Sequence, residues 1–467
     1  MTPPAGAALA APPVPATRVR YAVLGLLCSL AMITYMDRAA NGSAKTAIMA
    51  DLNAAGSSYT KDDFFIVLMA FQLAYAMFEI PSGWLGDTRG PRSTLLRVVI
   101  WWTAFVALTG LTGLTLPGGF YVGFGALVVM QFLFGVGEAG AFPNIAKALY
   151  NWFPASDRGF AKSAVWTCAR CMGGLTPLVW LLLTADDFAG LTWRQAMWLF
   201  AAVAGLWTVA FFVLFRNRPT EVPSVNEAEL AYIDAGRTAP SKVDSVPWGK
   251  LIRSRNLWAI CFMYVVTNFC WYFLMYFLPD ELKAQFPEWN TTPGGKVLLA
   301  VLAGTPLLVG MLGCYLGGVL SDKYIRRTGD RKWGRRLMGM IGYGGAGLCY
   351  LAAAGVKLND PGNLWAFAGL LMLMGFFNDL IMAPAWAVCQ DVGQQYAATV
   401  SGAMNMFGNL VGAVSGIFVT GTIMKAFPTA EGPDGILYCF SIYAGVYFAG
   451  VIAWLTIDAT KPIAAVE

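Results

Sequence analysis

Residues 82–87 read Ser-Gly-Trp-Leu-Gly-Asp, and residues 317–322 read Gly-Gly-Val-Leu-Ser-Asp. Each segment closes an apolar stretch, contains a glycine followed by Leu two residues later and Asp four residues later, and leads into a basic loop. Glycine lets two helices approach closely, and an Asp at a helix end can pair with an arginine or with the positive end of a neighbouring helix. A motif that occurs twice at equivalent places predicts a chain built from two related halves.

Apolar runs of about 20 residues, the length that crosses a bilayer, recur on both sides of these segments. Of 467 residues, 57% are hydrophobic and 13% are charged, and the mean hydropathy is +0.57. Soluble domains are nearer half apolar and about a quarter charged, so a soluble protein is excluded. Twelve spans are expected, near residues 19–42, 62–85, 93–115, 119–141, 159–184, 194–215, 257–279, 297–320, 336–356, 363–389, 397–422 and 436–458.

A long polar stretch separates the first six spans from the last six. This division predicts an all-α membrane protein with twelve transmembrane helices in two six-helix bundles and a substrate cavity between them. The expected domains are a disordered N-terminus (1–18), a first bundle (19–215), a linker loop (216–256), a second bundle (257–458) and a tail (459–467).

Basic residues gather at one set of span ends. They include Arg18 and Arg20 before the first span, Arg158 and Lys162 at the fifth, and a dense run at 323–336 after the eighth, whereas the opposite loops carry few. Basic residues favour the cytoplasmic side, so both termini and the linker are predicted to be cytoplasmic in a multi-pass protein of the inner (plasma) membrane. The first apolar run has no small-residue cleavage site and is interpreted as a retained span.

Missing residue types limit the chemistry. The chain has no histidine, the commonest metal ligand and usual proton carrier near neutral pH, so proton coupling would have to use carboxylates. Several of the nine cysteines, such as Cys28 and Cys314, lie within apolar runs, which argues against a disulfide framework or a zinc site. Phosphate-loop and His-Glu-x-x-His motifs are absent from the sequence. We therefore expect no enzyme, no ATP-driven pump, no cofactor and no nucleic-acid partner.

These features resemble the major facilitator superfamily, whose loop signature is matched by residues 83–92 (GWLGDTRGPR). More narrowly, the sequence is similar to the anion:cation symporters, which include bacterial sugar-acid transporters and vesicular organic-anion carriers. The resemblance covers nearly everything after residue 18. Its further motifs are Tyr75 and residues 35–38 (YMDR), 79–83 (EIPSG), 135–143 (GVGEAGAFP), 151–154 (NWFP) and 401–409 (SGAMNMFGN).

The resemblance implies a monomeric carrier in the lipid bilayer that moves a small organic anion together with protons. It also implies an arginine two turns before Glu138, but this chain has Gln131 there. A different intramembrane arginine, Arg170, lies in the fifth span. Two interpretations stay open for Arg170, a substitute anion-binding cation or a structural residue.

Intramembrane charges are the first candidates for function, because a charge at the bilayer centre costs about 2.5–3.5 kcal/mol. Arg38 is expected to bind a substrate carboxylate through its planar guanidinium; the alternative is a structural salt bridge with Asp37. Neutralising an ordinary glutamate at pH 7 costs about 3.7 kcal/mol, so Glu138 is balanced between its two forms and is the predicted proton-coupling residue. Asp37 is the second proton candidate, and permanent pairing of Glu138 with an arginine is the alternative.

Further polar and aromatic side chains are expected to line the cavity and bind substrate, namely Tyr75, Trp271, Asn405 and Asn409. Asn405 and Asn409 are one helical turn apart and share a face. Ordinary interhelical hydrogen bonds would explain either asparagine equally well. Trp271 belongs to a seventh-span aromatic cluster that could stack on a substrate ring or cap the outer gate.

Asp87, Arg92 and Asp322 lie at span ends beside basic loops. They are therefore expected to hold the cytoplasmic gate rather than to touch substrate.

The predicted function is secondary active transport, with protons and a small organic anion carried together by alternating access. A sugar acid such as a hexuronate or aldonate is the expected substrate, because the Asn and Tyr groups suit hydroxyls. The alternative is a facilitator or exporter of an aromatic carboxylate or a neutral solute on the same fold. A membrane enzyme or receptor is the third and weakest hypothesis.

Overall fold

The computed structural model describes residues 15–54, 56–59, 61–184, 189–235, 245–289, 291–356, 361–427 and 435–463. These residues are mostly helical, which confirms the predicted all-α class. The helices, with 3-10 and π segments marked η, are α1 (Val19–Ala54), α2 (Lys61–Arg89), α3 (Pro91–Thr109), α4 (Phe124–Glu138), α5 (Ala141–Trp152), α6 (Arg158–Thr184), α7 (Trp193–Leu214), η1 (Pro219–Glu221), α8 (Glu227–Asp234), α9 (Trp248–Ile252), α10 (Arg255–Tyr272), η2 (Phe273–Phe277), α11 (Leu278–Gln285), α12 (Pro293–Thr328), α13 (Arg331–Ala354), η3 (Pro361–Asn363), α14 (Leu364–Leu380), α15 (Met382–Gly393), η4 (Gln394–Tyr396), α16 (Ala397–Phe407), η5 (Gly408–Ala413), α17 (Val414–Ala426) and α18 (Gly435–Thr456).

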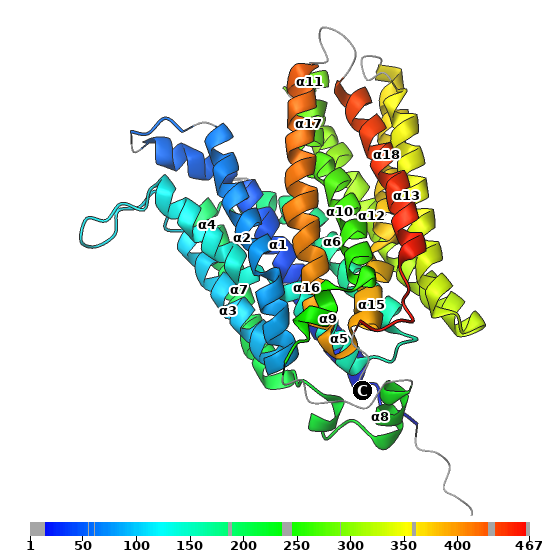
Figure 1. Cartoon of the computed structure of the whole chain (residues 1–467). Coiled ribbons are helices and arrows are strands. Elements are labelled where there is room, and N and C mark those ends of the chain that lie inside the picture. The colour runs from blue at the N-terminus through cyan, green and yellow to red at the C-terminus, as the bar shows by residue number, and fades with distance from the viewer. Residues whose placement is uncertain are drawn as a thin grey trace, which may run out of the picture.

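The helices form two groups, α1–α7 and α10–α18, and the short helices α8 and α9 lie in the chain between them (Figure 1). The groups meet where α2 packs against α16 and α6 against α12. Figure 1 shows the groups converging toward α8 and diverging toward the opposite end. The end that carries α8 and α9 is called the linker end below.

The glycines of the repeated motif allow the two groups to touch. A Cβ atom at Gly83 of α2 would lie 2.5 Å from the carbonyl oxygen of Ala398. One at Gly318 of α12 would lie 2.3 Å from the carbonyl oxygen of Gly159 in α6. Both helix pairs therefore approach closely only because these positions lack a side chain.

The aspartates of the same motif reach the other group in matching ways. The carboxylate of Asp87 accepts hydrogen bonds from the backbone N–H groups of Ala398 (3.2 Å) and Thr399 (2.7 Å) at the start of α16. The carboxylate of Asp322 accepts one from the N–H of Phe160 (2.7 Å) near the start of α6. Each acid thus lies at the positive end of a helix in the opposite group.

Two helical passages break near the interface between the groups. Between α4 and α5, Gly140 has φ 93°, a left-handed conformation that favours glycine, and a Cβ there would lie 2.2 Å from the Cβ of Ser82. Between α14 and α15 the chain turns at Ile381, and Pro384 follows in the first turn of α15, where proline is tolerated. The breaks leave Glu138 and Asp379 at the ends of α4 and α14.

The predicted C-terminal end of the third span and the predicted N-terminal end of the fourth span were wrong. The predictions were 93–115 and 119–141, but α3 ends at Thr109 and α4 begins at Phe124. Between them the chain turns through Gly113, Gly118 and Gly119, which have positive φ, and Thr115 pairs with Tyr121 in an isolated β-bridge. The apolar composition continues through this hairpin, so hydropathy did not mark the helix ends.

Within the described residues, nine helical stretches are long and apolar enough to cross a membrane, and one of them, Leu364–Ala426, contains two predicted spans. The linker is partly ordered: Glu229 of α8 pairs with Arg20 at the start of α1, with Nη1 and Oε1 2.8 Å apart. Parts of the predicted N-terminus, linker and tail, residues 1–14, 236–244 and 464–467, lie outside the described residues.

Candidate functional site

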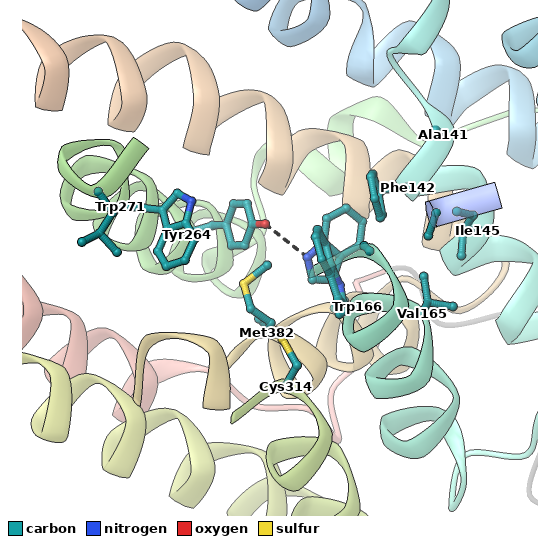
Figure 2. Packing of buried hydrophobic residues seen from close by; sticks show 14 of the residues in the cluster. Ala141, Phe142, Ile145, Val165, Trp166, Tyr264, Trp271, Cys314 and Met382 are labelled. Carbon is teal, nitrogen blue, oxygen red and sulfur yellow. Dashed lines mark hydrogen bonds between the residues drawn. The ribbon is translucent and has the colours of Figure 1, made fainter. Parts of the chain in front are cut away.

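A cavity of 310 Å³ lies between the two helix groups and is lined by both. Below it, toward the linker end, Phe142 of α5 and Trp166 of α6 stack with ring centroids 4.5 Å apart. Trp386 of α15 packs against Trp166 with centroids 5.6 Å apart and donates a hydrogen bond of 3.3 Å to the hydroxyl of Tyr264. Figure 2 shows Phe142 and Trp166 across from Tyr264 and Met382. Aromatic rings from both groups thus separate the cavity from the linker end.

Arg38 lines the cavity and contacts Glu138, so the two leading candidates of the sequence form one unit. Arg38 Nε lies 2.5 Å from Glu138 Oε1, and the guanidinium carbon lies 4.3 Å from the centre of the Tyr75 ring. The second carboxylate oxygen of Glu138 and Nη2 of Arg38 are buried without a hydrogen-bond partner in the described part of the chain. The pair therefore leaves donor and acceptor capacity unused at the cavity.

Asp37 does not form the alternative salt bridge with Arg38. Both of its carboxylate oxygens are buried without a hydrogen-bond partner among the residues described. Adjacent residues of a helix point in different directions, so Asp37 packs inside the first group while Arg38 faces the cavity. The hypothesis of a structural bridge within the first span was wrong for this reason.

Arg170 and Asp379 form the second ion pair at the cavity. Nε and Nη2 of Arg170 donate hydrogen bonds of 2.8 and 3.0 Å to Oδ2 and Oδ1 of Asp379. The guanidinium carbon also lies 4.4 Å from the centre of the Trp271 ring, and Nη1 donates to the hydroxyl of Tyr35 at 3.4 Å. This pair joins α6 of the first group to α14 of the second.

Gln131, which stands where the resemblance implies an arginine, lines the same cavity. Its amide nitrogen donates to Oδ1 of Asn41 at 3.0 Å and to the hydroxyl of Thr109 at 3.2 Å. The position therefore contributes a neutral hydrogen-bonding group, and among the described residues that line the cavity the cations are Arg38 and Arg170.

Asn405 and Asn409 line the cavity and face α2 from α16 and η5. Asn405 Nδ2 donates to the hydroxyl of Tyr75 at 3.0 Å, and Asn409 Oδ1 accepts from Gln72 at 2.9 Å. Asn409 also donates to Oδ1 of Asn405 at 3.2 Å, as their shared helix face predicted. These amides bridge the two groups with interhelical hydrogen bonds, as the alternative interpretation expected.

Glu79 of α2 is a buried acid beside the cavity. The sequence did not single it out as a candidate site residue. It is fully buried, and its Oε1 accepts a hydrogen bond of 2.5 Å from Asn405 Nδ2. Its Oε2 has no hydrogen-bond partner within the described ranges. An acid inside an apolar run was visible at residues 79–83, but it was used there only as part of a motif.

Lys162 of α6 is a second residue whose place the sequence did not reveal. Although it was interpreted as a cytoplasmic-end charge, it is fully buried. Its ammonium lies 4.2 Å from the centre of the Trp386 ring and has no hydrogen-bond partner in the part of the chain that the structure describes. The Lys162 side chain therefore packs directly against the aromatic rings.

Buried ion pairs lie below these rings, and the pair of Arg158 and Asp391 connects the two groups. Arg158 Nη1 of α6 lies 3.0 Å from Asp391 Oδ1 of α15. Arg335 of α13 contacts both Asp391 (3.2 Å) and Asp322 (2.8 Å). Lys147 lies 3.3 Å from Asp87. The pair of Arg158 and Asp391, together with the helix-end contacts of Asp87 and Asp322, holds the linker end closed in this conformation.

Arg92, the third predicted gate residue, contacts its own helix group. Its Nη2 donates to the carbonyl of Phe212 in α7 at 2.6 Å, and its backbone N–H donates to Asn217 at 2.9 Å. The structure therefore places Arg92 away from the contact between α2 and α16.

The sequence profile of the Major Facilitator Superfamily matches residues 27–416. A probable sulfoacetate transporter of Cupriavidus necator is 30% identical over 448 residues, covering 94% of each chain. A probable galactarate/D-glucarate transporter of Escherichia coli is 29% identical over 466 residues, again covering 94% of each. The human organic anion transporter MFSD10 has a similar fold, with a TM-score of 0.64, 12% identity and coverage of 94% of this chain and 100% of that one.

Proposed function

The chain belongs to the Major Facilitator Superfamily, and on that premise we propose that it carries a small organic anion with protons by alternating access. It is a transporter and not an enzyme, since the family and the relatives named above are transporters. The observation that carries the proposal is the pair of cavity arginines, Arg38 and Arg170, each held by one protein carboxylate. When the protein carboxylate releases its arginine, that arginine can bind the carboxylate of a substrate instead.

The chemistry of the cavity favours a carboxylate or sulfonate substrate. Guanidinium groups bind planar oxyanions through two parallel hydrogen bonds, and the Arg170–Asp379 pair already uses that geometry. The relatives are described as carriers of sulfoacetate and of galactarate or D-glucarate. A cavity of 310 Å³ is at the small end of ligand sites. We propose a short-chain or sugar acid, with hydroxyl groups bound by Tyr75, Asn405 and Asn409.

Proton coupling is proposed to use Glu138. Protonation of Glu138 would remove the charge that holds Arg38, and the freed guanidinium would then accept a substrate carboxylate. When the linker end opens and the proton leaves, Glu138 would pair with Arg38 again and displace the substrate. This exchange needs only the contact between Arg38 Nε and Glu138 Oε1 and the unused donor and acceptor beside it. Asp37 is the second proposed proton site, because its carboxylate is buried and has no hydrogen-bond partner within the described ranges.

The distribution of basic residues indicates to which side of the membrane this conformation opens. If the linker end is cytoplasmic, as the distribution of basic residues suggests, the closed linker end makes this conformation outward-facing. We propose an inner-membrane location with both termini in the cytoplasm and a monomer as the working unit.

An aromatic acid is the second candidate substrate, because Phe142, Trp166 and Trp271 line the cavity. The test is uptake into proteoliposomes with an inward proton gradient, screened over sulfoacetate, aldarates, aldonates, hexuronates and aromatic acids. Gradient-stimulated uptake of one acid class supports symport. Uptake that ignores the gradient would leave a facilitator, and uptake of neutral solutes alone would overturn anion transport.

A further inference from the structure

A second cavity, of 740 Å³, opens at the linker end, apart from the transport cavity. It lies where α10 begins and α18 ends, and Arg336 of α13 contributes to its wall. We propose that this cavity binds the phosphate headgroup of an anionic phospholipid from the membrane leaflet at the linker end. The site does not depend on the proposed transport function.

The walls of the cavity are strongly basic. Among the described residues that line it are one acid, Asp458, and five basic residues, Lys250, Arg253, Arg255, Arg336 and Lys461. Even without Lys250, the cations Arg253, Arg255, Arg336 and Lys461 outnumber the acid among these residues. Basic pockets between transmembrane helices at the cytoplasmic side are typical binding places for acidic lipid headgroups.

Asp458, the acid among the described residues of the wall, does not cancel the positive charge of these cations. Partial burial raises the pKa of Asp458, but hydrogen bonds from the hydroxyl and N–H of Thr460 and the charges of Lys332 and Lys461 lower it below its ordinary value overall. Asp458 is therefore an anion at neutral pH, and its Oδ2 lies 3.6 Å from Lys332, which is not part of the cavity wall. Its charge is thus shared with a cation outside the cavity.

The wall is held in place by hydrogen bonds. Asn256 Nδ2 donates to the carbonyl of Asp458 at 2.7 Å, and Asn256 Oδ1 accepts from the Asp458 N–H at 2.9 Å. Arg336 Nε donates to the carbonyl of Ile457 at 2.6 Å. The segment after α18 is therefore fixed to α10 and α13, and the cavity has a defined shape.

Apolar side chains beside the cavity distinguish a lipid from a soluble anion. Trp258 and Phe262 on α10 are 46% and 51% exposed, and Ile452 and Leu455 on α18 are 65% and 42% exposed. Helices α10 and α18 pack against each other, and these exposed side chains lie in the parts of both helices nearest the cavity. A soluble phosphate would use only the cations, whereas a phospholipid can also place its acyl chains against exposed apolar side chains.

The experiment compares lipids on purified full-length protein. Phosphatidylglycerol is titrated into phosphatidylcholine nanodiscs, and bound lipid is measured by native mass spectrometry and thermal shift. Each basic residue near the surface contributes about 1 kcal/mol to binding an acidic lipid, so Arg253→Gln with Arg255→Gln should weaken phosphatidylglycerol binding about 20- to 30-fold. Arg253→Lys with Arg255→Lys should keep it within about threefold. The matched control, Lys323→Gln with Arg327→Gln, removes the same charge from the end of α12, outside the cavity, and should leave binding unchanged.

Two results would overturn the proposal. An equal loss in the α12 control would show diffuse attraction to the membrane rather than a site. Equal stabilisation by inorganic phosphate or glycerol 3-phosphate, lost in the double Gln variant, would show a soluble-anion site. If the double variant does not fold, Lys461→Gln replaces it, with an expected loss of about fivefold; unchanged binding there counts against the proposal.

Discussion

Arg170 of α6 and Asp379 of α14 face each other between the two helix groups and share two hydrogen bonds of 2.8 and 3.0 Å. Asp379 lies next to the break after α14, and Glu138, which holds Arg38, ends α4 at the break before α5. Each cavity arginine is thus neutralised by an acid beside an interrupted helix. Because burying an unpaired charge is costly, an incoming anion must take the place of one of these acids.

Glu138→Gln should abolish proton-gradient-driven uptake and leave counterflow exchange largely intact. Glutamine keeps the shape of the side chain but cannot exchange a proton, so Arg38 stays free for the substrate. Both activities are measured in proteoliposomes. Equal loss of both would mean that Glu138 is structural or binds substrate.

Arg38→Ala should weaken binding of the transported acid by about 30- to several-thousand-fold, because removing one partner of a desolvated charge pair costs about 2–5 kcal/mol. Arg38→Lys keeps the charge and loses the bidentate geometry, so its loss should be smaller. Direct binding to purified variants checks both. Unchanged affinity in folded Arg38→Ala protein would point to a neutral solute.

Asp379→Asn should destabilise the protein by about 3–5 kcal/mol, because it leaves the buried guanidinium of Arg170 uncompensated. The double variant Arg170→Met with Asp379→Leu should regain most of that stability yet bind the substrate anion poorly. Thermal unfolding and ligand binding are measured on the same samples. Full substrate affinity in the double variant would show that the pair of Arg170 and Asp379 has only a structural role.

Asp87→Asn and Asp322→Asn should slow turnover and leave the substrate dissociation constant within a few-fold. Both carboxylates lie at helix starts of the opposite group, below the aromatic rings and away from the cavity. Arg92→Gln is the informative comparison, because Arg92 contacts α7 and Asn217 in the first half of the chain. Its effect on turnover should be smaller. A large loss of affinity from either Asp variant would contradict the gate hypothesis.

Glu229→Gln should lower thermal stability at pH 7, and the difference from wild type should disappear in acid. Burial raises the pKa of Glu229, but hydrogen bonds from Thr17, from the N–H and guanidinium of Arg20, and from the N–H of Val19 lower it below its ordinary value overall. A lowered pKa stabilises the fold above the pKa of the unfolded chain, about 4.3, and this contribution is lost as pH falls through the folded value. Melting curves between pH 7 and pH 3 measure it, and a pH-independent difference would exclude the ionised contact.

The sequence by itself determined the class of the molecule. Twelve apolar runs, a polar linker and a doubled Gly-Asp motif establish a two-group helical membrane protein, because backbone in lipid must satisfy its hydrogen bonds within helices or closed barrels. The same reasoning singled out Arg38, Glu138 and Arg170, since a charge in an apolar run is costly and therefore conspicuous.

Only the tertiary structure decided which groups meet. Pairing of Arg38 with Glu138 rather than with Asp37, of Arg170 with Asp379, and the burial of Lys162 against Trp386 all depend on how helices distant in sequence rotate toward one another. The hairpin between α3 and α4 also escaped prediction, because glycines turn the backbone there without interrupting the apolar composition. Hydropathy indicates whether a residue favours apolar or polar surroundings. The packing between helices determines which residues it contacts.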